Sequence, residues 1–308
     1  METVSKPNHR IKKRILITGV TGYLGSHLAQ AFVSSGYKVV GLKRQSSSLK
    51  RLKKITPSLS LYDIEDLELA NFFKDQELFE AIIHTATCYG RRGESDQELV
   101  QSNVVFPQSL LKAAMEAGNR KFINSDSSLP KEVSAYSLSK THFLDWGKYY
   151  AKKLNFLFIN MKIEHFFGPG DDSSYKFPSA VISNCVYNKP FMNLTDGKQL
   201  RDFIFIDDVV SAFVKVISSD LRVSGNNYKE FEVGTGKAIS VKDFVLNIHK
   251  VANSKTILNF GTVSRRSGDS KFYQVDTSEL EKLGWVCLHT VYDGIKITVE
   301  SEQSKIKR

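Results

Sequence analysis

Three tyrosine–lysine pairs with the same four-residue spacing occur in the sequence: Tyr136/Lys140, Tyr149/Lys153 and Tyr292/Lys296. On a helix, residues four apart lie on one face with their Cβ atoms about 5–6 Å apart, so an ammonium can lie beside a phenol. A cation in that place favours phenolate and lowers the pKa of the phenol from about 10 toward neutrality. A tyrosine in such a pair can therefore donate or accept a proton, provided that a substrate site surrounds it.

Apolar strand-like segments and helix-like segments alternate along the first half of the chain. The strands are "RILITGV", "KVVGLKR", "EAIIHTAT", "KFINSDS" and "FLFINMKIEH", and helical patterns such as "SLLKAAMEAG" and "AYSLSKTHFLDWGKYYAKKL" lie between them. Short continuous apolar strands between amphipathic helices predict a parallel sheet covered on both faces. We therefore predict an α/β fold, a Rossmann-like doubly wound parallel sheet, with a smaller C-terminal substrate-binding cap.

Three glycines, Gly19, Gly22 and Gly25, follow the first predicted strand at the start of a helix in "ITGVTGYLGSHL". They permit a tight turn, a close approach of the backbone to a pyrophosphate, and close packing of helix on strand, with the anion at the helix N-terminus. Because the triplet stands between a strand and a helix, it predicts a dinucleotide site that also includes Tyr23 and Leu24.

The second predicted strand ends in "GLKRQSSS", at the place where an acidic residue would bind the ribose hydroxyls of NAD. No acid stands there, and Lys43 and Arg44 could instead bind the 2′-phosphate of NADP, Arg44 through a forked contact. We therefore expect NADPH as the cofactor, with a solvated basic rim as the structural alternative. Asp63 closes the third strand and is expected near the adenine, together with Ile64.

In a doubly wound sheet the ligand lies beyond the carboxyl ends of the strands, so a catalytic pair must lie near such an end. The strand in "KFINSDSS" runs out into Ser125, and Tyr136 follows it by eleven residues. Tyr149 lies 13 residues further along the same helix, which corresponds to about 20 Å. Only the pair of Tyr136 and Lys140 is therefore expected to face the cofactor.

Composition narrows the class of protein. With 308 residues, of which 41% are hydrophobic and 25% charged, the chain is long enough for a large domain and a cap. Three widely spaced cysteines predict reduced thiols and no structural metal, and no apolar run is long enough to span a membrane, so we expect a cytoplasmic protein. The net charge of +10 lies in short basic runs without interleaved aromatics, which disfavours nucleic acid and suits an anionic small ligand.

The segments "TGVTGYLGSHL", "INSDSS" and "YSLSK" resemble the extended short-chain dehydrogenase/reductases that work on nucleotide sugars, the NAD-dependent epimerase/dehydratase family. The resemblance runs from Arg14 to Trp285. It implies that Tyr136 and Lys140 are catalytic, that Ser125 hydrogen-bonds the reacting oxygen, and that Lys140 also holds the nicotinamide ribose. It further implies a nucleotide-sugar substrate, and we also expect a homodimer.

Further contacts are expected around this centre. The backbone of Thr85, Ala86 and Thr87 would lie near the cofactor. The residues expected to contact the substrate are Tyr89, Asp126, Ser127, His165, Lys176, Phe177, Arg201 and Arg266, the two arginines through its diphosphate. We predict a cofactor-binding domain of residues 1–167 and 203–219, and a cap of residues 168–202 and 221–308.

Three departures from the family pattern narrow the function. Sugar-nucleotide 4,6-dehydratases carry Thr-Asp-Glu at the strand end, whereas this chain has Ser125-Asp126-Ser127, which argues against dehydration. His165 precedes "FFGP" where most relatives have Asn, and it is either a subgroup trait or a buried, hydrogen-bonded core residue. Arg91–Arg92 in "CYGRRGES" has no counterpart that we can match, and it lies where sugar selectivity could be set.

These residues predict NADPH-dependent reduction of a nucleotide-linked 4-keto-deoxyhexose to an alcohol, with Tyr136 as the proton donor. Further stretches, among them "IIHTATCYG" and "FINMKIEHFFGPGDD", resemble family members that reduce CDP-4-dehydro-3,6-dideoxy-D-glucose in O-antigen assembly for lipopolysaccharide. Three alternatives stay open: a dTDP- or GDP-linked substrate, a 4-epimerase that retains NAD, and a non-enzymatic protein that keeps only the nucleotide loop.

Overall fold

A computed structural model describes residues 13–153, 156–171, 176–221, 227–265 and 271–306. Its centre is a seven-stranded parallel sheet. Across the sheet the strands are β11 (Tyr228–Val233), β6 (Leu157–Ile163), β5 (Lys121–Ser127), β4 (Ala81–His84), β1 (Arg14–Thr18), β2 (Lys38–Lys43) and β3 (Leu59–Asp63). The strand order reverses between β1 and β4, and ligands of doubly wound sheets bind beyond the strand ends at such a point.

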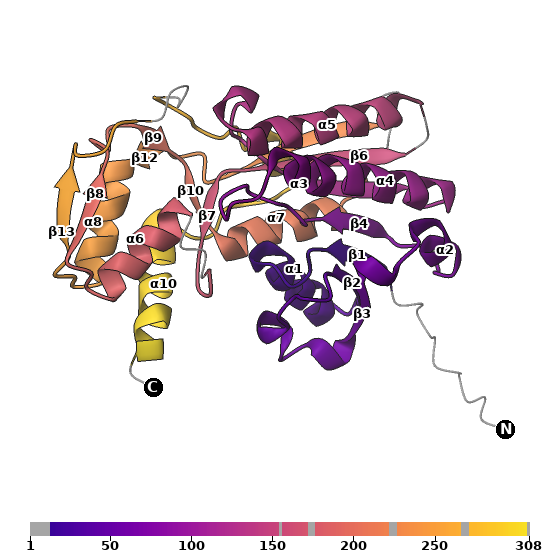
Figure 1. Cartoon of the computed structure of the whole chain (residues 1–308), viewed down its shortest axis with the longest axis horizontal. Helices are drawn as coiled ribbons and strands as arrows, with labels where there is room; N and C mark the ends of the chain where they lie inside the picture. The colour runs from indigo at the N-terminus through magenta and orange to yellow at the C-terminus, as the bar shows by residue number, and fades with distance from the viewer. Residues whose placement is uncertain (1–12, 154–155, 172–175, 222–226, 266–270, 307–308) are drawn as a thin grey trace.

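Helices cover both faces of this sheet (Figure 1). The elements on one face are α1 (Tyr23–Ser34) and α7 (Ile206–Ser218), and those on the other are α2 (Leu69–Lys74), α3 (Asp96–Val100), η4 (Gln101–Val105), α4 (Phe106–Glu116) and α5 (Ala135–Lys153). On β5, Phe122 packs into the core under α4 and α5, whereas Ile123 packs into the core under α1 and α7. Successive strand residues point to opposite faces, so one apolar run builds two cores. The predicted doubly wound α/β fold is confirmed.

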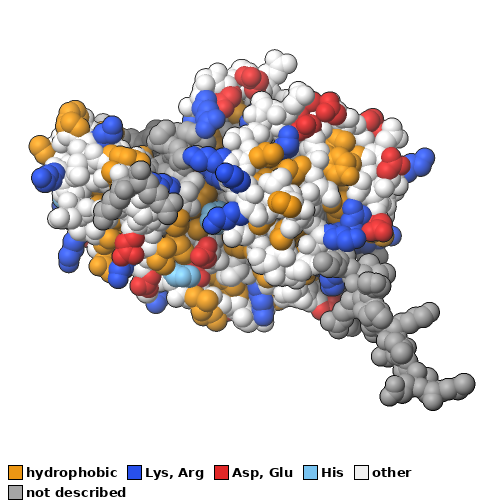
Figure 2. All heavy atoms as spheres, turned by 90° about the horizontal axis from the view of Figure 1, so that it is seen from below, with side chains coloured by type: hydrophobic (Ala, Val, Ile, Leu, Met, Phe, Trp, Pro, Cys, Tyr) orange, Lys and Arg blue, Asp and Glu red, His pale blue; other side chains and the backbone are white. Residues whose placement is uncertain are grey.

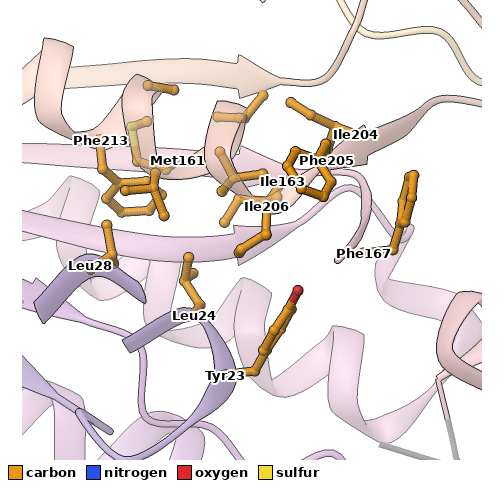
Figure 3. Close-up of a cluster of buried hydrophobic side chains, with 14 of the residues drawn as sticks. Tyr23, Leu24, Leu28, Met161, Ile163, Phe167, Ile204, Phe205, Ile206 and Phe213 are labelled. Atoms are coloured by element: carbon orange, nitrogen blue, oxygen red, sulfur yellow. The ribbon is translucent and has the colours of Figure 1, made fainter. Parts of the chain in front are cut away.

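Apolar packing fixes the start of α1 (Figure 3). Leu24 and Leu28 of α1 pack toward Met161 of β6 and Phe213 of α7, and both Leu28 and Phe213 are fully buried. Burial of a side chain of this size stabilises the fold by about 1.5–3 kcal/mol. The loop that precedes α1 is thereby held at the carboxyl ends of the central strands.

A smaller lobe lies beside the sheet (Figure 1). Its elements are α6 (Phe177–Val186), β8 (Phe191–Leu194), β9 (Leu200–Arg201), β12 (Ile239–Ser240), α8 (Val241–Val251), β13 (Ile257–Phe260) and α10 (Val291–Ile306). Strands β8 and β13 pair in parallel, and β9 pairs antiparallel with β12. Phe203 of β10 (Phe203–Phe205) stacks on Phe244 of α8 with 3.7 Å between ring centroids, a contact that joins the lobe to the rest of the molecule.

Two strands depart from the predicted division into domains. The sequence prediction puts residues 221–308 in the cap, but β11 pairs with β6 at the edge of the central sheet. The prediction also returns residues 203–219 to the central sheet. In the structure α7 covers that sheet, but β10 does not join it, because β10 pairs with β7 (His165–Phe167) in a separate two-stranded sheet. Strand β11 has the sequence "YKEFEV". An edge strand buries only part of its side chains and can carry charged residues, so the apolar pattern that predicts a sheet strand is missing here.

Short helical turns complete the described chain: η1 (Lys50–Leu52), η2 (Thr56–Ser58), η3 (Ile64–Asp66), η5 (Lys131–Val133) and α9 (Ser278–Lys282). Cys88, Cys185 and Cys287 are all free thiols. No helix in the described ranges is long and apolar enough to cross a membrane. The same ranges contain no group of three or more His, Cys, Asp and Glu residues that could hold a metal ion.

Candidate active site

The glycine-rich loop between β1 and α1 leaves no room for side chains. Gly19 has a φ of +65°, and a Cβ there would lie 2.7 Å from the Ala86 backbone. A Cβ on Gly25 would lie 2.3 Å from the Gly19 carbonyl oxygen. Gly22 caps α1 without a side-chain hydrogen bond, and no acidic residue stands in the first turn. The first N–H groups of α1 are therefore free of side-chain caps and suit an anion, so this loop fits a dinucleotide pyrophosphate.

The chain after β4 lies against this loop. Thr85 Oγ1 donates to the Thr18 carbonyl oxygen at 2.7 Å, and the Ala86 amide donates to Thr18 Oγ1 at 3.3 Å. His84 is fully buried, with its Nδ1 2.8 Å from Thr18 Oγ1. Burial, and to a lesser extent the charge of Lys140, lower the pKa of His84 well below its ordinary value. The imidazole therefore stays neutral and has a structural role.

The two predicted residues inside α1 point into the protein. Leu24 packs in the core, and the Tyr23 ring points toward Phe205 and Ile206, away from the loop (Figure 3). The Tyr23 hydroxyl is buried and has no hydrogen-bond partner among the described residues. A cofactor contact of either residue would therefore run through its backbone.

The two basic residues at the end of β2 have different surroundings. Lys43 forms an ion pair with Asp63, which stands opposite it on β3, so residues predicted for two parts of the cofactor contact each other. Arg44 is exposed, and its guanidinium makes no hydrogen bond or ion pair to any residue that the structure describes. Ile64 begins η3 directly after Asp63 and is partly buried. Of the two cations, Arg44 is the one available to a phosphate.

The predicted catalytic pair, Tyr136 and Lys140, lies at the start of α5, but the lysine side chain does not point at the phenol. Lys140 is buried, and its Nζ donates to the Ser125 carbonyl oxygen at 2.7 Å. Burial lowers the pKa of Lys140, and the Asp126 carboxylate opposes this shift. The Tyr136 ring packs on the Tyr89 ring, with 5.0 Å between centroids. Lys140 therefore links α5 to the end of β5 rather than to the phenol.

The pKa of Tyr136 moves in the direction opposite to the sequence prediction. Burial raises it well above its ordinary value, and Tyr89 and Asp126 add to this rise. Arg91 and a hydrogen bond with the Ser127 side chain act against it. The predicted lowering by a lysine fails because desolvation of the phenol outweighs the nearby charges. Tyr136 is thus a neutral phenol at physiological pH, which is the form that donates a proton.

Two serines at the end of β5 are candidates for the hydroxyl that assists Tyr136: Ser125, which the sequence predicts, and Ser127. Ser125 Oγ donates to the His84 carbonyl oxygen at 2.9 Å, whereas the Ser127 side chain acts on the Tyr136 phenol and lowers its pKa. The two serines share one face of β5 because they are two residues apart. Of the two, only Ser127 affects the pKa of the phenol.

His165 is hydrogen-bonded without being buried. Its Nδ1 lies 2.6 Å from Glu164 Oε2, and the Glu164 carboxylate, which is buried, also accepts a hydrogen bond from Ser128. The His165 side chain keeps 29% of its surface exposed. Asp126 accepts hydrogen bonds from the Ser127 amide at 2.8 Å and from Asn160 Nδ2 at 3.0 Å. Asp126 is therefore held toward β6.

The cap residues predicted for the substrate that the structure describes lie on two elements, α6 and β9. Arg201 of β9 is buried, and its Nη1 donates to the Leu200 carbonyl oxygen at 2.7 Å. Phe177 packs toward Phe244 in the cap core. Arg266 lies outside the described residues. Basic side chains gather near the middle of the face drawn in Figure 2, where the two lobes meet, which suits an anionic ligand.

Comparison with known proteins now places the chain. The sequence model of the NAD dependent epimerase/dehydratase family matches residues 15–234. The chain belongs to this family. Among curated family relatives, CDP-abequose synthase of Salmonella typhimurium is 32% identical over 289 residues, which cover 89% of this chain and 93% of the relative. CDP-abequose synthase of Salmonella muenchen is 31% identical, with 93% of this chain and 97% of the relative covered.

Solved structures agree with the epimerase/dehydratase family fold. UDP-glucose 4-epimerase of Thermotoga maritima superposes with a TM-score of 0.82 at 20% identity, over 95% of this chain and 99% of that one. UDP-glucuronic acid 4-epimerase of Bacillus cereus, solved with UDP-glucuronic acid and NAD, also has a TM-score of 0.82, at 22% identity over the same shares. At these identities the likeness concerns the fold alone.

One residue that the sequence reasoning left without a role connects two parts of the candidate site. Asn103 is buried in the π-helical turn η4, and its Oδ1 accepts from the Cys88 amide at 2.8 Å. Its Nδ2 donates to the Cys88 carbonyl oxygen at 2.8 Å and to Ser139 Oγ at 3.0 Å. Asn103 thus ties the chain after β4 to the turn of α5 that carries Lys140. The signal was an amide side chain inside the apolar run "SNVVFP".

The position of the serine also changes the comparison with dehydratases of the family. If the hydroxyl next to the phenol is Ser127, the two positions that hold acids in a dehydratase fall on Ser128 and Leu129. Neither residue is acidic. The sequence prediction that dehydration is disfavoured is therefore the same with either serine, and it stays a prediction.

Proposed function

We propose that the protein is an NADPH-dependent reductase of a nucleotide-linked 4-keto-deoxyhexose. The observation that carries this proposal is the placement of the Tyr136 phenol, which packs on Tyr89 while Lys140 bonds the end of β5, on a sheet whose first glycine loop fits a dinucleotide. The CDP-abequose synthases, which are 31–32% identical over about nine-tenths of the chain, support a nucleotide-sugar substrate. We infer that this substrate is CDP-4-dehydro-3,6-dideoxy-D-glucose and that the product is CDP-abequose or a stereoisomer, for O-antigen synthesis.

The residues around the phenol supply proton chemistry. NADPH, held at Gly19, Gly22 and Gly25, would supply a hydride to the carbonyl carbon. Tyr136 gives its hydroxyl proton to the carbonyl oxygen as that carbon is reduced to an alcohol. Ser127 hydrogen-bonds the same oxygen and stabilises its developing charge.

Lys140 and the cap complete the proposed site. Lys140, anchored on the Ser125 carbonyl, orients the nicotinamide ribose, while the exposed Arg44 binds the 2′-phosphate. Arg201 and Arg266 bind the substrate diphosphate, and His165 and Tyr89 line the sugar site. Residues 1–167 and 203–219, together with β11, form the cofactor-binding domain, and the remaining residues form the cap.

A panel of nucleotide sugars tests this function. Purified protein receives NADPH with CDP-, dTDP- or GDP-linked 4-keto-6-deoxy and 3,6-dideoxy sugars, the loss of reduced-cofactor absorbance is followed, and NMR determines the product configuration at C4. We expect turnover in the CDP series. Turnover of dTDP or GDP sugars alone would reject the CDP assignment and keep the reductase. Protein that carries NAD and interconverts 4-epimers without added reductant would instead be an epimerase.

We also propose a homodimer. Adjacent helices of one sheet face expose the large apolar side chains Val100, Val105, Leu138 and Trp146. Leu138 and Trp146 are eight residues apart on α5 and share a face, and Figure 1 shows α5 beside α3 and α4. A second copy would cover this surface. Light scattering should give twice the chain mass of 34.8 kDa, and a single-chain mass would contradict the proposal.

A further inference from the structure

Lys176, the residue that caps α6, places its ammonium in a cage of aromatic rings. Its Nζ lies near three ring centroids: Phe166 at 4.6 Å, Tyr23 at 5.4 Å and Tyr89 at 5.6 Å. Asp171 Oδ2 lies 3.6 Å from the same Nζ, and Ser179 Oγ donates to that carboxylate at 2.8 Å. The lysine side chain keeps 14% of its surface exposed and the aspartate 2%. A cation over ring faces is attracted by their electrons, most strongly where water is excluded.

The three rings come from different parts of the molecule: the start of α1, strand β7 and the segment after β4. Tyr23 is the first residue of α1 after the glycine loop, and it stacks on Phe166 of β7 with 5.9 Å between centroids. Tyr89 follows β4 and packs on the catalytic Tyr136. One cap ammonium therefore contacts both the start of the dinucleotide-binding helix and the ring that supports the proton donor.

We propose that Lys176 is a positioning residue that holds Tyr89 against Tyr136 and docks the cap on the start of α1. Its role in the reaction rests on the function proposed above. The ammonium is already paired with Asp171 and surrounded by rings, which leaves it little surface for a direct contact with a sugar. A buried ion pair adds little net stability, because desolvation offsets its attraction, but it fixes which surfaces meet.

Three variants separate this role from a general effect on folding. Lys176→Met keeps the length of the side chain without its charge, and Lys176→Arg keeps a cation that can lie over the rings. Lys242→Met is the matched control, because Lys242 Nζ lies 5.2 Å from the ring centroid of Phe260 and both residues belong to the cap. For each variant we would measure kcat, KM for the nucleotide sugar, the Kd of NADPH, and thermal unfolding.

We expect Lys176→Met to lower kcat by about three- to thirtyfold, the range that loss of a largely desolvated cation–π contact gives. Lys176→Arg should restore most of the rate, and Lys242→Met should stay within about twofold of the unmodified protein. If Lys176→Met keeps its full kcat while the other proteins are active, the proposal is wrong. Lys176→Gln answers the same question should Lys176→Met fail to fold.

A double-mutant cycle distinguishes positioning from direct binding. In a Tyr89→Leu background, Lys176→Met should lower kcat no further, because the lysine acts through that ring. A full additional loss, with a raised KM for the sugar, would mean that Lys176 contacts the substrate and would overturn the positioning role. If the unmodified protein reduces no sugar of the panel, the proposed function fails first. The Kd of NADPH then decides this inference: weakening in Lys176→Met supports it, and no change rejects it.

Discussion

Helix α5 carries the same tyrosine–lysine spacing at both of its ends, and the two pairs behave differently. At the exposed end, Lys153 Nζ donates to the Tyr149 hydroxyl at 2.8 Å and lies 4.5 Å from the ring centroid. At the buried end, Lys140 turns away from Tyr136 and bonds the strand carbonyl of Ser125. The pair that makes the direct contact expected from spacing is thus the one without a site around it.

The difference shows that a four-residue spacing permits a tyrosine–lysine contact, whereas the surroundings of the pair decide whether that contact forms. In water, nothing competes with the Tyr149 hydroxyl for the ammonium. At the end of β5, the Ser125 carbonyl oxygen lies 2.7 Å from Lys140 Nζ, and a buried ammonium must find such an acceptor. The pKa of Tyr136 depends instead mainly on burial, which raises it, while Ser127 lowers it.

The largest expected effect comes from removing the two phenols in turn. Tyr136→Phe should lower kcat by about 10²–10⁴, the scale of general acid–base catalysis, because it removes the proton donor while keeping the ring. The Kd of NADPH should stay nearly unchanged. Tyr149→Phe is the matched control on the same helix and should keep its rate. If Tyr136→Phe retained more than half of the activity, the two ends of α5 would not differ in function.

The two serines of β5 give the next largest contrast. Ser127→Ala should lower kcat by about a hundredfold, because it removes the hydrogen bond to the reacting oxygen. Ser125→Ala should lower it by less than about tenfold, since its hydroxyl bonds only a backbone carbonyl in the described chain. Steady-state rates of both variants measure this. The reverse order of losses would return the role to Ser125, as the sequence suggested.

The adjacent cations Lys43, the last residue of β2, and Arg44, which follows it, give a second contrast between a paired and an exposed group. Arg44→Ala should weaken NADPH binding by about ten- to a hundredfold, the scale of a hydrogen-bonded charge, and leave NADH within about twofold. Titration of each cofactor by fluorescence measures this, with Lys54→Ala, an exposed cation nearby, as the control. An equal loss for both cofactors, or equal use of both by the unmodified protein, would remove the NADPH assignment.

The smallest expected effect concerns the free energy of unfolding and not the reaction rate. Burial raises the pKa of Tyr23 far above its ordinary value. The folded protein therefore favours the protonated phenol of Tyr23. The unfolded chain has a Tyr23 pKa of about 10, so the contribution of this group to the free energy of unfolding is present below about pH 10 and is lost as the pH rises above it. Tyr23→Phe should be at least as stable as the unmodified protein at neutral pH, because the lost hydroxyl has no described partner, and it should lose less stability in alkali.

Chemical denaturation of both proteins at neutral pH and above pH 10 checks this expectation. Tyr149→Phe, which removes an exposed hydroxyl, controls for the general effect of losing a phenol. A clear loss of stability in Tyr23→Phe at neutral pH would mean that the hydroxyl is bonded in the folded protein.

The sequence by itself determined the fold class and the neighbourhood of the site. Alternating apolar strands and amphipathic helices predict a doubly wound sheet because each pattern has its own period. The glycine spacing after the first strand predicts the anion-binding turn, since only glycine tolerates the backbone contact seen at Gly19. The position of Tyr136 after a strand end excluded the other two pairs. All of these signals are local in the chain.

Only the tertiary structure decided which partner each group has. Ser125 and Ser127 have the same chemistry and lie on the same face of β5, but Ser125 bonds the His84 carbonyl whereas Ser127 acts on the pKa of Tyr136. Lys43 meets Asp63 because β2 and β3 pair in that register. The pKa of Tyr136 rises because the folded chain removes water from the phenol. Burial and cross-strand register depend on segments far apart in the sequence, so no local pattern of residue types encodes them.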